Sequence, residues 1–221
     1  MDDYDRFLRE DLDEEGDITS QALFSDEKGK AIIIAKEPCV VAGLTEASIV
    51  FEKTGANCIH LVKDGEHVEK RTEIATISGS IRSILKAERL ALNFLGRMSA
   101  IATTTKRLVD ECSKINPNVS IAATRKTTPG FRRYEKKAVT IAGGEPHRFG
   151  LFDAVMIKDN HIKAIGSIEK AITKVKNQIT TKTIEIEVEN ETDAMIAADF
   201  NVDVIMLDNF SAERGKKIHI F

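Results

Sequence analysis

Basic side chains concentrate in one part of the sequence, between Thr124 and Arg148. This segment holds seven Lys and Arg residues against two acids, a net charge of +5 in a chain whose formal charge is −3. Arg125 and Lys126 follow one apolar run, and His147 and Arg148 lie near the next. A cationic island in a mildly acidic protein indicates a site for a multiply charged anion. The planar guanidinium groups of Arg125 and Arg148 suit paired contacts with carboxylate or phosphate.

Three more ionisable residues occur at the ends of separate apolar runs. Lys158 follows one run, Glu187 lies near the end of the next, and Asp208 follows the last. A lysine can hold an anion, whereas the two acids suit either the stabilisation of a cationic transition state or contact with Mg²⁺.

The pattern of elements after residue 100 predicts how these residues are positioned. Strand-like runs alternate with helical patterns, the strands at 119–123, 154–157, 183–188 and 202–207 and the helices at 131–141, 167–178 and 191–198. Repeated βα units imply parallel strands with right-handed crossovers. Charged residues directly after such strands are typical of an α/β barrel, whose active site lies at the C-terminal strand ends. We therefore expect one mouth of the barrel to be lined by Arg125, Lys126, Lys158, Glu187 and Asp208.

The first part of the chain has a different pattern. A short helix is expected within residues 1–15, and strands are expected at 31–36, 58–63 and 72–78, with a helix at 45–51 and a long amphipathic helix at 83–98. The helical pattern resumes at 101–112 after an expected break near Ser99 and Ala100. We place the domain boundary at this break, which gives domains 1–99 and 100–221.

Composition excludes several classes of protein. Hydrophobic residues make up 42% and charged residues 30% of the chain, as in ordinary globular proteins, and a pI near 6.0 argues against general binding of nucleic acid. Cys39, Cys58 and Cys112 are widely spaced, which argues against a disulfide framework or a zinc site and favours a reducing cytoplasm. The acidic N-terminus does not resemble a secretory signal, and no apolar run is long enough to span a membrane.

Several of these residues have a plain structural alternative. Glu185, Glu187 and Glu189 could form one solvated strand face, and the basic residues of the 131–141 helix favour a solvated helix face (Arg132, Arg133, Lys136 and Lys137). His161 could contact a ligand or make a hydrogen bond within its loop. Asp208 could cap a helix. Gly143 and Gly144 could form a tight turn or bring backbone amides close to an anion.

Seven short motifs in a fixed order carry a resemblance to a known family. They are EDL with GDIT (10–19), AERLALNFLGRMSAIAT (87–103), TRKTTPG (124–130), GGEPHRFGL (143–151), IKDNHI (157–162), EIEVE (185–189) and IMLDN (205–209). Together they resemble the nicotinate-nucleotide pyrophosphorylases (carboxylating), also called quinolinate phosphoribosyltransferases, over nearly the whole chain.

The resemblance implies a fold and a reaction. The expected fold is α/β, with an N-terminal α/β sandwich domain followed by an α/β barrel. The implied pentosyltransferase reaction converts quinolinate and phosphoribosyl pyrophosphate to nicotinate mononucleotide, pyrophosphate and CO₂ in the de novo route to NAD. Mg²⁺ accompanies the pyrophosphate. Family members are homodimers or hexamers, with no nucleic-acid or membrane partner expected.

The resemblance also assigns roles by motif position. Arg125, Lys126, His147 and Arg148 would surround the quinolinate carboxylates, and Arg89 would reach into the site of a partner subunit. The phosphoribosyl donor and its metal would face a second set, namely Lys126, Lys158, Glu187 and Asp208. Of these, Lys126, Glu187 and Asp208 are the expected catalytic residues, and Glu187 and Asp208 would contact the metal indirectly.

Two features depart from the family pattern. Glu145 and Pro146 precede His147 where Val-Asn is frequent, and the Pro variant also occurs in a paralogue associated with molybdenum transport. The family continues past LDN with glycine-rich phosphate-binding segments that do not occur before Phe221, so we expect an incomplete, C-terminally truncated barrel and weakened donor binding. The alternatives are therefore an impaired homologue or the paralogue, binding an aromatic carboxylate, and a fragment that only dimerises.

Overall fold

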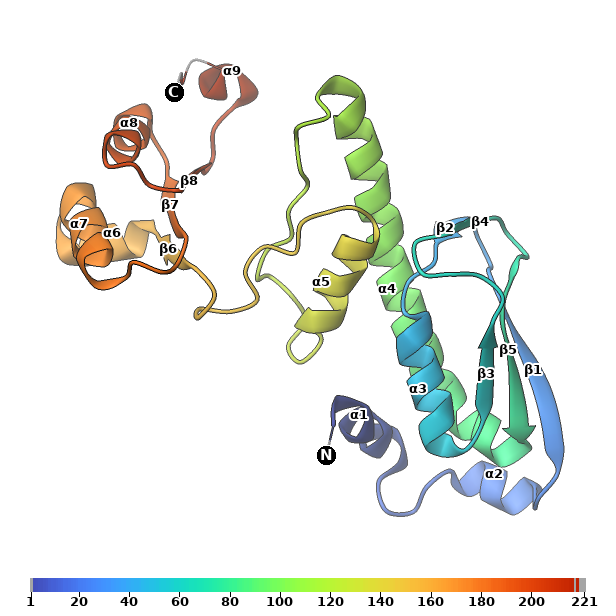
Figure 1. The fold of residues 1–221 in the computed structure, drawn as a ribbon. Helices are drawn as coiled ribbons and strands as arrows, with labels where there is room; N and C mark the ends of the chain where they lie inside the picture. The colour runs from blue at the N-terminus through green and yellow to red at the C-terminus, as the bar shows by residue number, and fades with distance from the viewer. Residues whose placement is uncertain (1, 217, 219–221) are drawn as a thin grey trace. The chain divides into compact units, whose positions relative to one another are not determined.

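The computed structural model describes residues 2–216 and 218 and divides into two compact units (Figure 1), Met1–His147 and Arg148–Phe221. No helix within the described residues is long and apolar enough to cross a membrane. Each unit is considered by itself below.

The first unit is built on a small antiparallel sheet. The strands β1 (Lys28–Ile34), β5 (Glu73–Ser80) and β3 (Asn57–His60) pair in the order β1-β5-β3, and β2 (Cys39–Val40) pairs with β4 (His67–Val68). The helices α3 (Leu44–Thr54) and α4 (Ile81–Ile115) lie side by side against one face of the sheet (Figure 1). Two layers around one apolar core confirm the expected N-terminal α/β sandwich.

Helix α4 is one continuous element of 35 residues, so the expected break near Ser99 and Ala100 is wrong. Two polar side chains in this part of the helix bind the β2 segment. The Ser99 hydroxyl accepts a hydrogen bond from the Ala42 amide at 3.0 Å, and the Thr103 hydroxyl accepts one from the Val40 amide at 2.9 Å. The domain boundary at residues 99 and 100 stays a prediction.

Aromatic side chains join three helices in the first unit. Helix α1 (Asp3–Leu12) contributes Tyr4 and Phe7, α4 contributes Phe94, and Phe131 and Tyr134 come from the start of α5 (Arg132–Ile141). The ring centroids of Phe94 and Tyr134 are 4.8 Å apart in an edge-on arrangement, a geometry that favours aromatic pairs. These rings pack α5 on α4, so the end of the loop that precedes α5 is held in place. The remaining helix of this unit is α2 (Ile18–Leu23).

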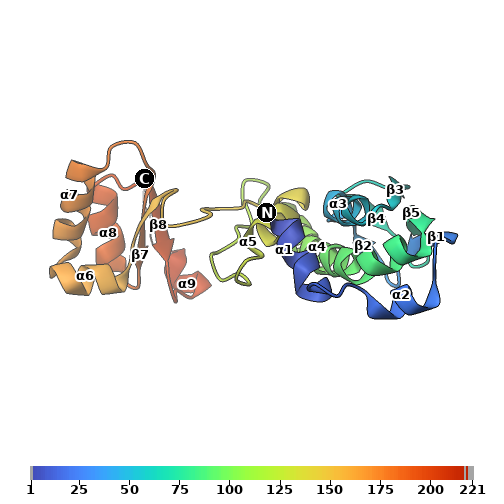
Figure 2. The same cartoon turned by 90° about the horizontal axis from the view of Figure 1, so that it is seen from below.

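The second unit has the predicted parallel βα pattern. Its strands β6 (Val155–Ile157), β7 (Ile184–Val188) and β8 (Val204–Leu207) pair in parallel, in sequence order. Helices α7 (Ile168–Gln178) and α8 (Glu191–Asp199) cover one face of the sheet (Figure 2). The short helices α6 (Asp159–Ile165) and α9 (Ala212–Gly215) complete the unit. Three parallel strands with helices on one face are part of an α/β barrel, as in the predicted fold class of an incomplete barrel.

The strand expected at 119–123 does not form. In its place Ala122 makes one isolated parallel bridge with Glu145, and the Ala123 amide donates to the Glu145 carbonyl at 2.9 Å. The segment therefore pairs with the loop after α5. The sequence pattern could not distinguish this single bridge from a full strand, because both require extended backbone.

Candidate active site

The loop that carries Arg125 and Lys126 is ordered by its own threonines and by a turn. The Thr124 hydroxyl accepts a hydrogen bond from the Lys126 amide at 3.1 Å, and the Thr127 amide donates to the Arg125 carbonyl at 2.9 Å. Short polar side chains commonly fold back on the backbone in this way. These contacts give Arg125 and Lys126 defined backbone positions, with the Arg125 side chain half-buried and Lys126 exposed.

A turn at Pro129 and Gly130 then leads into α5. The Phe131 amide donates to the Thr128 carbonyl at 3.0 Å, and Gly130 has a φ of +78°. Proline followed by a residue with positive φ is the signature of a type II turn, in which glycine carries no steric cost at the third position.

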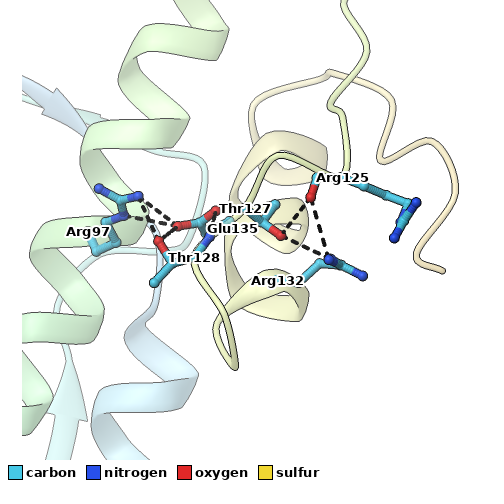
Figure 3. A network of polar contacts seen from close by, with 6 residues as sticks. All are labelled: Arg97, Arg125, Thr127, Thr128, Arg132 and Glu135. Carbon is cyan, nitrogen blue, oxygen red and sulfur yellow. Dashed lines mark hydrogen bonds and ion pairs between the residues drawn. The ribbon is translucent and has the colours of Figure 1, made fainter.

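The start of α5 holds this loop from both sides (Figure 3). The buried carboxylate of Glu135 accepts hydrogen bonds from the Thr128 amide at 3.3 Å and the Thr128 hydroxyl at 2.9 Å, and it also accepts the Arg97 guanidinium at 2.7 Å. Arg132 donates to the Thr127 hydroxyl at 2.9 Å. Burial alone would raise the pKa of Glu135, but the hydrogen bonds from Arg97 and Thr128 outweigh it and lower the pKa.

The segment that leads to His147 is held by a buried lysine. The Lys136 side chain is 0% exposed and its ammonium group donates to the Pro146 carbonyl. The neighbouring His147 is half-buried and has a φ of +52°, a conformation that is uncommon outside glycine and asparagine. Such backbone outliers often occur at functional sites.

The other basic residues of α5 also have structural partners. Arg133 stacks on the Tyr134 ring with its guanidinium carbon 4.5 Å from the centroid, and Lys137 pairs with the buried Glu46 at 2.7 Å. The interpretation of this helix face as solvated is wrong for the buried Lys136, and the other three basic residues make contacts with α1, α3 and the loop before α5 while remaining partly exposed.

Gly143 and Gly144 form a turn at the end of α5. Their amides donate to the carbonyls of Thr140 and Val139, both at 3.0 Å. A Cβ on Gly144 would lie 2.7 Å from a Val139 methyl carbon. The amides are thus engaged within the helix end, which favours the tight-turn alternative over an anion-binding loop.

Lys158 and Glu187 meet at the C-terminal end of the parallel sheet in the second unit. The ammonium nitrogen of Lys158 is 2.5 Å from Oε2 of Glu187, and both side chains are partly exposed. In the parallel register Ile157 is paired with Ile186, so the residues that follow each of them project to the same face. A charge-assisted contact of this length is among the stronger hydrogen bonds in proteins.

Asp208 lies one strand further along the same sheet face. Glu187 pairs with Met206, and Asp208 is two residues beyond Met206, so the strand period of two places it on that face. Its amide donates to the Val188 carbonyl at 2.9 Å, and its carboxylate accepts from the Asn209 amide group at 3.0 Å. Helix α9 is capped by Ser211, so the capping alternative for Asp208 is wrong.

The acids of β7 do not form a solvated strand face. Glu185 is 4% exposed and Glu187 half-buried, whereas Glu189 lies after the strand and is exposed. Ile184, Ile186 and Val188 alternate with them and pack in the core that includes α7 and α8. The strand is therefore covered on both faces, as expected of a strand in a parallel sheet.

Arg148, Arg89 and His161 complete the expected set. Arg148 is 9% exposed and its guanidinium donates to the Ala154 carbonyl at 3.3 Å. Arg89 is exposed on α4. The Nδ1 atom of His161 accepts a hydrogen bond from the Lys158 amide at 2.9 Å, which is the alternative of a hydrogen bond within the loop.

The expected residues are thus divided between the two units. The first unit carries Arg89, Arg125, Lys126 and His147, and the second carries Arg148, Lys158, Glu187 and Asp208. Within the second unit, Lys158, Glu187 and Asp208 share one sheet face. Sequence reasoning missed Glu135 and Arg97. Glu135 is the one acid among the basic residues of the α5 segment, which was a usable signal; Arg97 carried none.

Comparison with known proteins defines the class. The chain matches the quinolinate phosphoribosyl transferase N-terminal domain over residues 17–99 and the C-terminal domain of the same class over residues 101–219. It is 46% identical over 198 residues to a probable nicotinate-nucleotide pyrophosphorylase (carboxylating) of Archaeoglobus fulgidus, covering 90% of this chain and 75% of the relative. A relative with the same name from Bacillus subtilis is 41% identical, with 92% and 70% covered.

Solved structures agree. The nicotinate-nucleotide pyrophosphorylase of Ehrlichia chaffeensis superposes with a TM-score of 0.92 at 37% identity, covering 97% of this chain and 78% of that one. The enzyme of Francisella tularensis gives 0.88 at 40% identity, with 95% and 74% covered. The chain is therefore an α/β protein of the phosphoribosyl-transferring class. It belongs to the quinolinate phosphoribosyltransferase family.

Proposed function

We propose that this chain transfers the phosphoribosyl group of phosphoribosyl pyrophosphate to the ring nitrogen of quinolinate and releases nicotinate mononucleotide, pyrophosphate and CO₂. The observation that carries the proposal is the contact of Lys158 with Glu187, on the sheet face that also bears Asp208. A cation and two acids at the C-terminal ends of parallel strands can hold a phosphorylated sugar and stabilise positive charge on it.

Quinolinate is a dianion, and the basic residues suit its recognition. In our proposal Arg125, Lys126, His147 and Arg148 contact its carboxylates. The Nε atom of Arg125 supports this role, because it is buried without a hydrogen-bond partner among the described residues. A buried guanidinium N–H without a partner is costly, and an incoming carboxylate oxygen would satisfy it. Arg89, exposed on α4, would serve the site of a partner subunit.

The donor side of the site would use Lys126, Lys158, Glu187 and Asp208. As the bond between C1′ of the ribose and the pyrophosphate oxygen breaks, pyrophosphate leaves with the electron pair and the ribose gains oxocarbenium character. The carboxylates of Glu187 and Asp208 would stabilise this charge. The lone pair of the ring nitrogen then forms the new bond to C1′.

Decarboxylation follows from the charge of the glycosylated ring. The positive nitrogen stabilises the electron pair that remains on the adjacent carbon when its carboxylate leaves as CO₂, and a proton then adds to that carbon. The protein has to position and desolvate the substrate, with Lys126 and His147 as nearby positive groups. These roles require no covalent nucleophile.

Mg²⁺ enters our proposal as part of the donor substrate, bound to its pyrophosphate. Within the residues that the structure describes, no group of three or more His, Cys, Asp or Glu side chains could hold a metal, and Glu187 already contacts Lys158. In our proposal Glu187 and Asp208 contact the metal indirectly, through water molecules. Mg²⁺ bound to phosphate substrates usually retains several water ligands.

A homodimer or hexamer and a cytoplasmic location remain predictions from the family resemblance and the cysteine pattern. Sedimentation velocity would give the oligomeric state. Mixing Arg89→Ala subunits with Lys158→Ala subunits would show whether Arg89 serves a partner, because such hybrids should recover activity that neither variant has alone.

Turnover to nicotinate mononucleotide with Mg²⁺ tests the proposed reaction. We expect Arg125→Ala to reduce kcat/KM by roughly 10²-fold or more, the scale of one lost charge-assisted contact in a buried site. Arg107→Ala removes an exposed arginine of α4 and should leave the rate unchanged. Equal rates for Arg125→Ala and wild type would remove the proposed site.

Calorimetric titration separates the alternatives. Binding of both quinolinate and phosphoribosyl pyrophosphate is expected of the enzyme. Binding of quinolinate alone would indicate an impaired homologue or a paralogue that binds an aromatic carboxylate. Binding of neither compound would indicate a chain that only dimerises.

A further inference from the structure

Two residues at the start of α5 contact the 124–130 loop and lie outside the set assigned to substrate. Glu135 is 7% exposed and binds the C-terminal part of the loop through both the amide and the hydroxyl of Thr128. Arg132 binds the middle of the loop, through the Thr127 hydroxyl at 2.9 Å and the Arg125 carbonyl at 3.5 Å (Figure 3). The backbone of Arg125 is therefore tied to α5 directly.

Arg97 extends the network to α4. Its Nε and Nη2 atoms lie 3.2 and 2.7 Å from the same Glu135 oxygen, and Nη2 is also 3.3 Å from the Thr128 hydroxyl. The hydroxyl can donate to Glu135 and accept from Arg97 at the same time, so the contacts are mutually consistent. A buried carboxylate that receives several charge-assisted and backbone hydrogen bonds is a stiff anchor.

The loop needs an anchor of this kind because of its charge. Arg125 and Lys126 are adjacent, and Arg132 lies close by, so these cations repel one another when no anion is bound. Glu135 supplies the one carboxylate in the network of Figure 3. Without it the loop would lose both a counter-charge and two hydrogen bonds to Thr128.

We propose that Glu135 and Arg132 are positioning residues that fix the 124–130 loop so that Arg125 and Lys126 meet the anionic substrate without a conformational search. The proposal rests on the proposed function for its effect on quinolinate, and on the contacts above for its effect on the loop. Preorganisation of this type acts mainly on substrate affinity, since a loop that must be ordered during binding weakens the complex.

Glu135→Gln tests the first contact. The amide keeps the shape of the side chain but removes the charge and one acceptor, so it cannot receive both Arg97 and the two Thr128 donors. We expect the KM for quinolinate to rise by roughly tenfold, the loss expected of one charge-assisted hydrogen bond, with a smaller change in kcat. Arg132→Met should act in the same direction, and Arg132→Lys, which keeps a donor, should recover part of the loss.

Arg133→Met is the matched control. Arg133 lies on the same turn of α5 but stacks on Tyr4 and Tyr134 and pairs with Asp3, away from the loop. This variant should lower the melting temperature without raising the KM for quinolinate. If Glu135→Gln and Arg132→Met lower the melting temperature but leave that KM within about twofold of wild type, as Arg133→Met does, the positioning role is refuted.

Amide hydrogen exchange gives a readout that does not depend on the substrate. We expect exchange at 124–128 to accelerate by roughly tenfold in Glu135→Gln, the effect of losing about 1.4 kcal/mol of local stability, and to stay unchanged in Arg133→Met. Unchanged exchange in Glu135→Gln would overturn the anchor itself. A wild-type chain that makes no nicotinate mononucleotide would instead refute the proposed function, and the exchange result would still decide whether the anchor exists.

Discussion

The ammonium nitrogen of Lys158 lies 2.5 Å from the carboxylate of Glu187, although the two residues are 29 positions apart in the chain. They come from successive βα units, and the parallel register brings them to the same sheet face. In our proposal the pair holds the lysine and the acid ready for the phosphorylated sugar.

Removing either partner of this pair should reduce activity. We expect Lys158→Met and Glu187→Gln each to lower kcat/KM by about 10²–10³-fold, because each leaves the other group without its counter-charge and removes an electrostatic contact to substrate. The double variant should lose less than the product of the two single effects, since residues in contact are not additive. Full additivity of the two losses would contradict a coupled pair.

The stability contributed by Glu135 should depend on pH. Hydrogen bonds from Arg97 and Thr128 outweigh burial and lower its pKa below the usual value of 4.5, so its contribution is fully present above about that pH and is lost as the pH falls through the folded-state pKa. The free energy of unfolding, measured with urea at several pH values, should be higher for wild type than for Glu135→Gln. This difference, the gap between the two proteins, should be constant near neutrality and should become smaller below pH 4.5. A gap that widens with acidification would contradict the lowered pKa.

Lys136 should stabilise the first unit despite its charge. Its side chain is 0% exposed and its ammonium group donates to the Pro146 carbonyl, so Lys136→Ala removes a packed stem and orphans an acceptor. We expect a loss of about 2–4 kcal/mol in the free energy of unfolding. Lys106→Ala, which breaks an exposed pair with Asp110 on α4, should cost under ~0.5 kcal/mol. Similar losses in the two variants would show that burial of Lys136 is not important.

Phe94 should be among the most sensitive core positions. It is 1% exposed and its ring lies within 5.7 Å of the ring centroids of Tyr4 and Phe7 and within 5.2 Å of that of Phe131. Phe94→Ala should cost about 3–5 kcal/mol and loosen the contact between α1 and α5. Leu108→Ala, on a more exposed part of α4, is the control and should shift the thermal melt much less.

Local pattern was sufficient for most elements and for the pairing of β6, β7 and β8. Val155–Ile157, Ile184–Val188 and Val204–Leu207 lie where the apolar runs predicted strands, because parallel strands must be apolar on a covered face. The convergence of Lys158 and Glu187 followed from the same rule. These features could be predicted because the alternation of side chains along a strand determines both the sequence pattern and the sheet face on which each residue lies.

The errors came from contacts between distant parts of the chain. A break was expected near Ser99 and Ala100, yet α4 continues through them, and the hydroxyls of Ser99 and Thr103 bind the β2 segment. Lys136 and Lys137 read as surface residues because a helix pattern does not reveal the Pro146 carbonyl or Glu46 that receives each one. The role of Glu135 was missed for the same reason, since its partner Arg97 is 38 residues away.

Helix α4 is continuous across the point in the sequence where the two family domains meet. The match to the N-terminal domain ends at residue 99, and the match to the C-terminal domain begins at residue 101. The junction therefore lies inside the helix, between Ser99 and Thr103, which bind the β2 segment, and close to Arg97, which binds Glu135. Each residue along an α-helix turns it by about 100°. A chimera that joined halves from two relatives at this point would therefore have to keep the number of residues in the helix unchanged. Adding or deleting one residue would rotate Thr103 away from Val40 but would leave Arg97 in place.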